Sequence, residues 1–157
     1  MRSLHQFLVI GAMGLMGLLS LTFQRTSSDN DSASLMNEAV IYASGYSQSL
    51  MDEIQTKAFD EKTKSTSVTK VDSLSLVLGP DGETYAQFDD IDDYHGYAHT
   101  DTLSRLGTFR TGIRVHYVST MSPDTKSLLR TFSKRIELQV FNSYLPDTLS
   151  VMHVVSY

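Results

Sequence analysis

The stretch that decides the fold is FLVIGAMGLMGLLSLTF, which runs from Phe7 to Phe23 without a formal charge. Its 17 residues, at about 1.5 Å of helical rise each, approach the roughly 30 Å hydrocarbon thickness of a bilayer. The rest of the chain is polar and has no second such segment. We therefore expect residues 1–24 to form an N-terminal transmembrane anchor. The side chains expected to form it are Phe7, Leu8, Val9, Ile10, Leu15, Leu18, Leu19, Leu21 and Phe23.

A cleavable signal peptide is the main alternative to a retained anchor. Such a signal needs a small-x-small site directly after its apolar core. Here the core runs into Leu21-Thr22-Phe23-Gln24-Arg25, and the small residues Ser32-Ala33-Ser34 come well beyond it. The retained anchor is thus the preferred interpretation. Arg2 precedes the core, and the positive-inside rule then favours a cytoplasmic N-terminus and an exported body.

Composition limits what the exported body can be. The chain has 157 residues, so it holds one small domain besides the anchor. Its net charge of −5 disfavours nucleic acid as a partner. It has no cysteine, which excludes thiol catalysis, cysteine-rich zinc sites and disulfides. An exported domain without disulfides must gain stability from packing on a long helix or from neighbouring subunits.

A helical pattern occupies the segment after the anchor. Apolar or small residues recur three and four positions apart from Leu35 to Ala58, which predicts an amphipathic helix of about six turns. The polar segment Arg25–Ser34 contains weak helix formers, so we expect a frayed helix or a hinge there. Residues 25–60 are thus expected to continue the anchor. The side chains expected to pack on a sheet are Leu50, Met51, Ile54 and Phe59.

Residues 61–157 are expected to form the exported head. Apolar and polar residues alternate in Thr108–Ser119, in Thr131–Asn142 and in a closing strand that contains Leu149, Val151 and Val155. Val68–Leu78 is a further strand candidate. Alternation with period two predicts an antiparallel sheet with one buried face. The predicted fold class is α+β: a long N-terminal helix packed on an antiparallel sheet of three to four strands.

An acidic loop, expected over residues 81–101, precedes these strands. It contains Phe88-Asp89-Asp90-Ile91-Asp92-Asp93-Tyr94-His95-Gly96-Tyr97. Asp89, Asp90, Asp92 and Asp93 are candidate Ca²⁺ ligands, although their spacing is not that of an EF-hand. The simpler interpretation is that these carboxylates cap backbone amides and pair with nearby arginines, for which the candidates are Arg105, Arg110 and Arg114.

Other polar groups give weaker signals. His95 and His99 have a spacing that suits zinc only on a helix, and Gly96 indicates a loop. The sequence contains no recognisable catalytic set, so we expect neither an enzyme nor a cofactor.

The order of apolar helix, amphipathic helix, acidic loop and antiparallel strands resembles type IV pilins and the pseudopilins of type II secretion. Gln48–Gln55, followed by Phe59-Asp60, is similar to the helix end of minor pilins of the PilV and MSHA type. The segment from Phe88 to Tyr97 is similar to the "FDDVDDYxG" loop of the same group. The chain lacks the family's Gly-Phe processing site and the glutamate at the fifth mature position.

The resemblance implies a structural role. It implies a single-pass protein of the bacterial inner membrane whose head is periplasmic or extracellular. Its partners would be membrane lipid and other pilin-like subunits, which would assemble through the N-terminal helix. The alternative is a membrane-tethered binding module that uses the acidic loop for Ca²⁺ or a protein partner outside any filament.

Overall fold

The computed structural model describes residues 2–157, with side chains from His5 onward. Met1 and the side chain of Arg2, on which the expected orientation in the membrane depends, lie outside the described residues. One helix, α1 (Arg2–Gln55), opens the chain. The chain divides into two compact units, Met1–Glu38 and Ala39–Tyr157, so α1 contributes to both. The two units are described separately below.

In the first unit α1 is helical through the segment Arg25–Ser34, where fraying or a hinge was expected. Two hydroxyls of this segment bond to the helix backbone. The Thr26 hydroxyl donates to Thr22 O at 3.0 Å, and the Ser32 hydroxyl donates to Ser28 O at 3.1 Å. Hydroxyls that bond the carbonyl four residues back let Ser and Thr remain in a helix despite their low propensity.

In the second unit α1 buries one face. Ala39, Ala43, Ser47, Leu50 and Ile54 recur at three- and four-residue intervals and are all buried. Small residues at the first three of these positions let a neighbouring surface approach the helix axis closely. The helix ends at Gln55, three residues before the predicted end at Ala58.

The reason for the early end is a competing backbone contact. The Ala58 N–H donates to Asp89 O at 3.0 Å, and Ala58 O accepts from the Ile91 N–H at 2.9 Å. These two bonds form an isolated parallel bridge between Ala58 and Asp90. The backbone groups of Ala58 are therefore used by the acidic loop and not by the helix.

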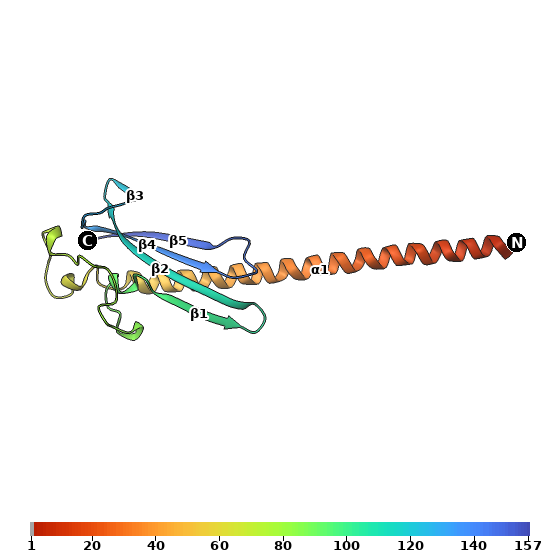
Figure 1. Cartoon of the computed structure of the whole chain (residues 1–157), viewed down its shortest axis with the longest axis horizontal. Coiled ribbons are helices and arrows are strands. Elements are labelled where there is room, and N and C mark those ends of the chain that lie inside the picture. Colours follow the sequence, from red (N-terminus) through yellow and green to blue (C-terminus); the bar gives the residue numbers. More distant parts are fainter. Residues whose placement is uncertain (1) are drawn as a thin grey trace. The chain divides into compact units, whose positions relative to one another are not determined.

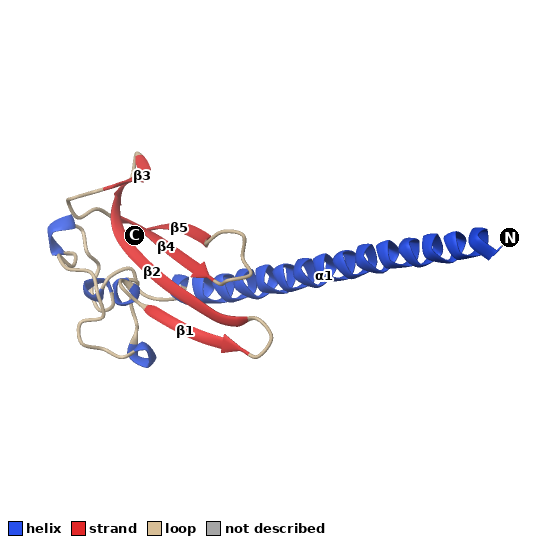
Figure 2. Ribbon diagram, turned by 45° about the vertical axis from the view of Figure 1, so that its right-hand side comes forward, coloured by secondary structure: helices blue, strands red, loops and turns tan. Residues whose placement is uncertain are grey.

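An antiparallel sheet of five strands follows (Figures 1 and 2). Its order is β1-β2-β4-β5, and β3 pairs with one end of β2. The strands are β1 (Ala98–Leu103), β2 (Gly107–Ser119), β3 (Ser122–Lys126), β4 (Ser133–Phe141) and β5 (Leu149–Ser156). Four single-turn 3-10 helices occupy the connection before β1: Glu61–Thr63, Val71–Ser73, Tyr85–Gln87 and Asp92–Tyr94.

The predicted α+β class is confirmed, and so are the strands expected at 108–119, 131–142 and the C-terminus. The sheet has five strands where three to four were predicted. The strand expected over Val68–Leu78 is wrong, because this segment contains the 3-10 turn at Val71–Ser73. Its alternation fails since Leu74 is buried whereas Leu76 and Val77 are 78% and 74% exposed.

Two strands lie where other structure was expected. β1 begins at Ala98, inside the predicted acidic loop 81–101. β3 begins with Ser122-Pro123-Asp124, between the two predicted strands Thr108–Ser119 and Thr131–Asn142. Both strands are polar and lie on the same edge of β2, where pairing with β2 is enough to hold them without an apolar face.

The inner face of the sheet supplies most of the core of the second unit. β2 contributes Phe109, Ile113, Val115 and Tyr117, in the alternation that the sequence predicts. β4 contributes Ile136, Leu138 and Val140, which are fully buried. A smaller cluster of Phe59, Val68, Leu74 and Tyr117 forms where α1 ends.

Candidate functional site

The acidic loop is held in shape by its own carboxylates. Asp90 Oδ1 accepts the N–H groups of Asp92 and Asp93 at 2.7 and 3.2 Å. In return, Asp93 Oδ2 accepts the N–H groups of Asp89 and Asp90 at 3.0 and 3.1 Å. Short acidic side chains favour such local bonds, which compete with regular secondary structure. Two of the four candidate Ca²⁺ ligands, Asp90 and Asp93, therefore cap backbone N–H groups, which is the simpler interpretation of the sequence.

An aromatic cluster packs the loop against α1. Tyr85, Phe88, Tyr94 and Tyr97 have ring centroids 5.0–6.3 Å apart. The hydroxyls of Tyr85 and Tyr94 donate to the two carboxylate oxygens of Glu53, each at 2.7 Å. Burial and this carboxylate raise the pKa of both phenols. Glu53 on α1 is thus the polar anchor for an otherwise aromatic contact.

A buried lysine on β4 lies beneath the loop. The side chain of Lys134 is 0% exposed, and its Nζ lies 3.0 Å from Asp60 Oδ2 and 2.5 Å from Asp92 Oδ1. The same Nζ donates to Phe59 O at 2.7 Å and lies 4.4 Å from the centroid of the Phe59 ring. One cation therefore joins the segment that follows α1, the acidic loop and the sheet.

Asp60 completes this network. Besides Lys134, it accepts hydrogen bonds from the Ser75 N–H and hydroxyl, both at 3.0 Å, and from the Tyr117 hydroxyl at 3.2 Å. Burial opposes ionisation of this carboxyl, but the Ser75 N–H and the positive charge of Lys134 outweigh it and lower its pKa to about 2. Asp60 is therefore the ionised counter-charge of Lys134.

The two buried loop acids behave in the opposite way. Burial raises the pKa of Asp92 to about 8, although Lys134 favours its ionised form. Burial, together with the charge of Asp93, raises the pKa of Asp90 to about 6. Perturbed carboxylates can mark functional sites or structural ion-pair networks. Here burial is the largest cause of both shifts, and Asp92 Oδ2 is buried without a hydrogen-bond partner among the described residues.

A possible metal cluster uses only part of the predicted ligand set. Ligand oxygens of Glu83, Asp89 and Asp93 lie within 4.8 Å of one another. Glu83 was not among the predicted ligands, whereas Asp90 and Asp92 are directed into the capping bonds and the Lys134 network. Lys64 Nζ already forms an ion pair with Asp89. The positive charge that lies next to this cluster is therefore the ammonium group of Lys64.

The pairing of the loop acids differs from the sequence expectation. Asp89 pairs with Lys64 and Asp92 with Lys134, whereas Arg105, Arg110 and Arg114 were expected as partners. Lys134 was missed, although a signal was present. It shares the parity of Phe132, Ile136 and Leu138, so the alternation of β4 itself places it on the buried face.

His95 and His99 have different neighbours in the head. His95 Nδ1 accepts the Val115 N–H at 3.1 Å, which fixes its ring at the edge of β2, and the ring centroids of His95 and His116 lie 6.4 Å apart. The His99 ring stacks on Tyr97 at 6.3 Å.

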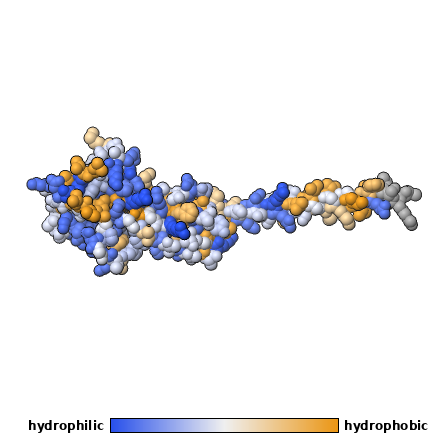
Figure 3. Space-filling model, viewed as in Figure 1, coloured by the Kyte–Doolittle hydropathy of each residue, from blue (hydrophilic) through white to orange (hydrophobic). Residues whose placement is uncertain are grey.

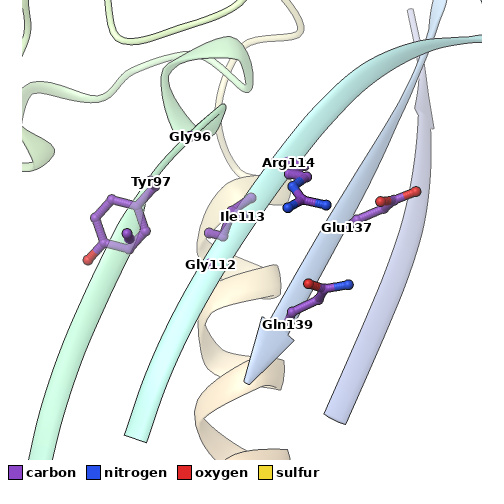
Figure 4. Close-up of a pocket in the computed structure, with 8 residues that line it drawn as sticks. Gly96, Tyr97, Gly112, Ile113, Arg114, Glu137 and Gln139 are labelled. Carbon is purple, nitrogen blue, oxygen red and sulfur yellow. The ribbon is translucent and has the colours of Figure 1, made fainter. Parts of the chain in front are cut away.

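The outer face of the sheet carries a shallow hollow. It measures about 220 Å³ and lies over Gly112, whose register partners are Ala98 on β1 and Gln139 on β4. Arg114 and Glu137, also register partners, project beside it (Figure 4). The hollow forms because Gly112 and Ala98 are small and leave this part of the outer face uncovered. Its volume is below the roughly 300–1,000 Å³ typical of ligand pockets.

An uncovered apolar surface lies on α1 from Phe7 to Phe23. The large apolar side chains of this segment are more than half exposed, and Figure 3 shows hydrophobic residues gathered toward the N-terminal end of the helix. The exposed set includes all of the predicted anchor residues: Phe7, Leu8, Val9, Ile10, Leu15, Leu18, Leu19, Leu21 and Phe23. By length and composition, this helix can span a membrane.

Comparison of the chain with protein-family models, with curated proteins and with solved structures found no match.

Proposed function

We propose that this protein is a membrane-anchored structural subunit, similar to a minor pilin or pseudopilin, that assembles with other such subunits through the first half of α1. The observation that carries the proposal is the apolar surface of residues 7–23, which nothing in the described part of the chain covers. Water is a poor solvent for such a surface, at about 25 cal/mol for each Å². Lipid or neighbouring helices must therefore cover it.

The rest of the chain supports a structural role. The acidic loop, which carries the sequence resemblance, is tied down by Lys134, Asp60 and Glu53. The long helix followed by an antiparallel sheet is consistent with pilin-like architecture. The proposed location is the bacterial inner membrane, with the N-terminus cytoplasmic and the head exported.

Helix contacts in the membrane would differ from those of the resembled family. No acid lies between Ser3 and Gln24, so the family's intramembrane glutamate cannot set the register here. Gly11, Gly14 and Gly17 have no neighbouring atoms within 4 Å of an added Cβ. Small residues on a bare helix let another helix approach, so these glycines are the proposed contact points.

The experiment is a cysteine scan, which suits a chain without cysteines. Each residue from Phe7 to Phe23 is replaced singly by Cys in the full-length protein, and disulfide formation is followed in native membranes. Assembly through the helix predicts cross-linked products that recur every three to four residues and include the glycines. Uniformly low cross-linking around the helix would leave an anchor but overturn assembly, and recovery of the uncut protein in the soluble fraction would overturn both.

A second candidate function is Ca²⁺ binding by the acidic loop, which the grouping of Glu83, Asp89 and Asp93 favours. On this hypothesis Ca²⁺ displaces Lys64 from Asp89 and stabilises the head by mass action. The test compares thermal unfolding of the full chain in Ca²⁺ and in EDTA. A Ca²⁺-dependent rise in Tm that Asp93→Asn removes and Asp72→Asn retains would support binding. Identical melting curves would reject it.

A further inference from the structure

The two edges of the sheet differ in chemistry. β1 is polar, and its Asp101 accepts a hydrogen bond from Tyr42 at 2.6 Å. β5, on the other edge, has the sequence LSVMHVVS, which contains no Asp, Glu, Lys, Arg or Pro. Met152 and Val154 on its outer face are 62% and 38% exposed. Edge strands of soluble domains usually carry charge or proline that prevents pairing, and β5 has neither.

The backbone of β5 has open bonding positions. The Tyr157 N–H donates to Phe132 O at 3.0 Å and extends the β4–β5 register. In an antiparallel ladder this bond turns the odd-numbered residues of β5 toward β4 and the even-numbered ones outward. Among the described residues, no backbone partner lies beyond Ser150, Met152, Val154 or Ser156.

The sequence of β5 is also nearly symmetric about His153. Reading outward from His153, Met152 is matched by Val154, Val151 by Val155 and Ser150 by Ser156. When two copies pair antiparallel about this centre, each residue faces one of the same class on the same face of the sheet. The outward-facing residues then form the hydrogen-bonded pairs, as the ladder requires.

We propose that β5 is a docking edge for β5 of a second copy of this chain, paired antiparallel about a two-fold axis at His153. The joined strands continue one sheet across two heads. Met152 of each copy packs against Val154 of the other, and the open backbone groups of both edges are satisfied. The neighbouring register, centred on Met152, is less favourable because it places Ser150 opposite Val154 and Val151 opposite His153.

The two-fold axis fixes how the two heads are arranged. It reverses β5, so the portions of α1 from Ala39 to Gln55 in the two heads run in opposite directions. The strand pairing does not rest on the proposed anchor.

The test uses full-length protein in detergent, without other subunits. His153→Cys should form a disulfide-linked dimer on mild oxidation, since opposed residues of a non-hydrogen-bonded pair have Cα atoms about 4.5 Å apart. His99→Cys, on the other edge of the sheet, is the matched control and should stay monomeric. If His99→Cys cross-links as readily as His153→Cys, random collision explains the dimer and the proposal fails.

A second variant tests the contact itself. In the His153→Cys background, Val154→Lys should reduce the dimer yield about tenfold, because it places a charge against Met152 of the other copy. Val154→Thr should retain it, and circular dichroism checks that both variants fold. An unchanged yield with Val154→Lys overturns the proposal. Mixing Met152→Cys protein with Val154→Cys protein should also yield a cross-linked dimer, and its absence would reject the register. None of these results depends on assembly through α1, which the membrane cysteine scan tests separately.

Discussion

The two parts of α1 show how one helix serves two environments. From Phe7 to Phe23 apolar side chains surround the helix and all are exposed, whereas from Ala39 to Gln55 most of them form one buried stripe and only Val40 and Ile41 are exposed among the large ones. A helix that is apolar all round suits a bilayer or a helix bundle, and a single stripe suits packing on a sheet. The distribution of apolar residues around the axis, more than their number, separates an anchor from a packing element.

The largest expected effect comes from removing the cation on which the packed unit depends and which the exposed part of α1 does not contact. Lys134→Met should destabilise the head by about 3–5 kcal/mol, because it leaves the buried, ionised Asp60 without its counter-charge. Urea unfolding, monitored by near-ultraviolet circular dichroism, measures the change. Lys64→Met is the matched control, since Lys64 also pairs with two acids but at the surface, and it should leave the unfolding curve nearly unchanged. Equal effects of the two variants would contradict the assigned role of Lys134.

A smaller effect is expected when one apolar side chain of α1 is shortened to alanine in each of its two environments. Ile54→Ala, in the buried stripe, should lower the free energy of unfolding of the head by about 3 kcal/mol through lost contacts and a cavity. Leu18→Ala, in the exposed part, should change it by less than about 0.5 kcal/mol. The same urea titration measures both. A comparable loss in the two variants would mean that the first part of α1 is packed by the head.

A further expected effect is a dependence of stability on pH. Asp90 and Asp92 have pKa values raised from 3.8 to about 6 and about 8, so their contribution to stability is complete below 3.8 and is lost as pH rises through the folded values. Asp60, with its pKa lowered to about 2, contributes above 3.8 and loses its contribution as pH falls toward 2. Between pH 5 and pH 8 the free energy of unfolding should therefore decrease.

Substitution of one loop acid isolates the cause. Asp92→Asn should flatten the decrease between pH 5 and pH 8, because an amide does not titrate. Asp89→Asn, at a partly exposed position that pairs with Lys64, is the control and should preserve the decrease. Parallel curves for the wild type and Asp92→Asn would show that another group produces the pH dependence.

The accuracy of the sequence predictions depended on the range of the interactions. The strands of Thr108–Ser119 and Thr131–Asn142 were predictable because alternation is a local signal. Val68–Leu78 alternates as well, yet it forms a 3-10 turn in which Leu74 enters the core and Leu76 does not. β1 and β3 have no apolar pattern and become strands through pairing with β2, a partner distant from any local window.

The sequence by itself determined the apolar helix, the α+β class and the parity that places each strand residue on one face, since these follow from local periodicity. Only the tertiary structure decided which charges meet. Lys134 lies 74 residues from Asp60 along the chain, and the pair forms because the end of α1, the acidic loop and β4 converge in the core. A buried charge needs an opposite charge close to it in space. The spacing of two residues along the sequence does not show whether the fold brings them together.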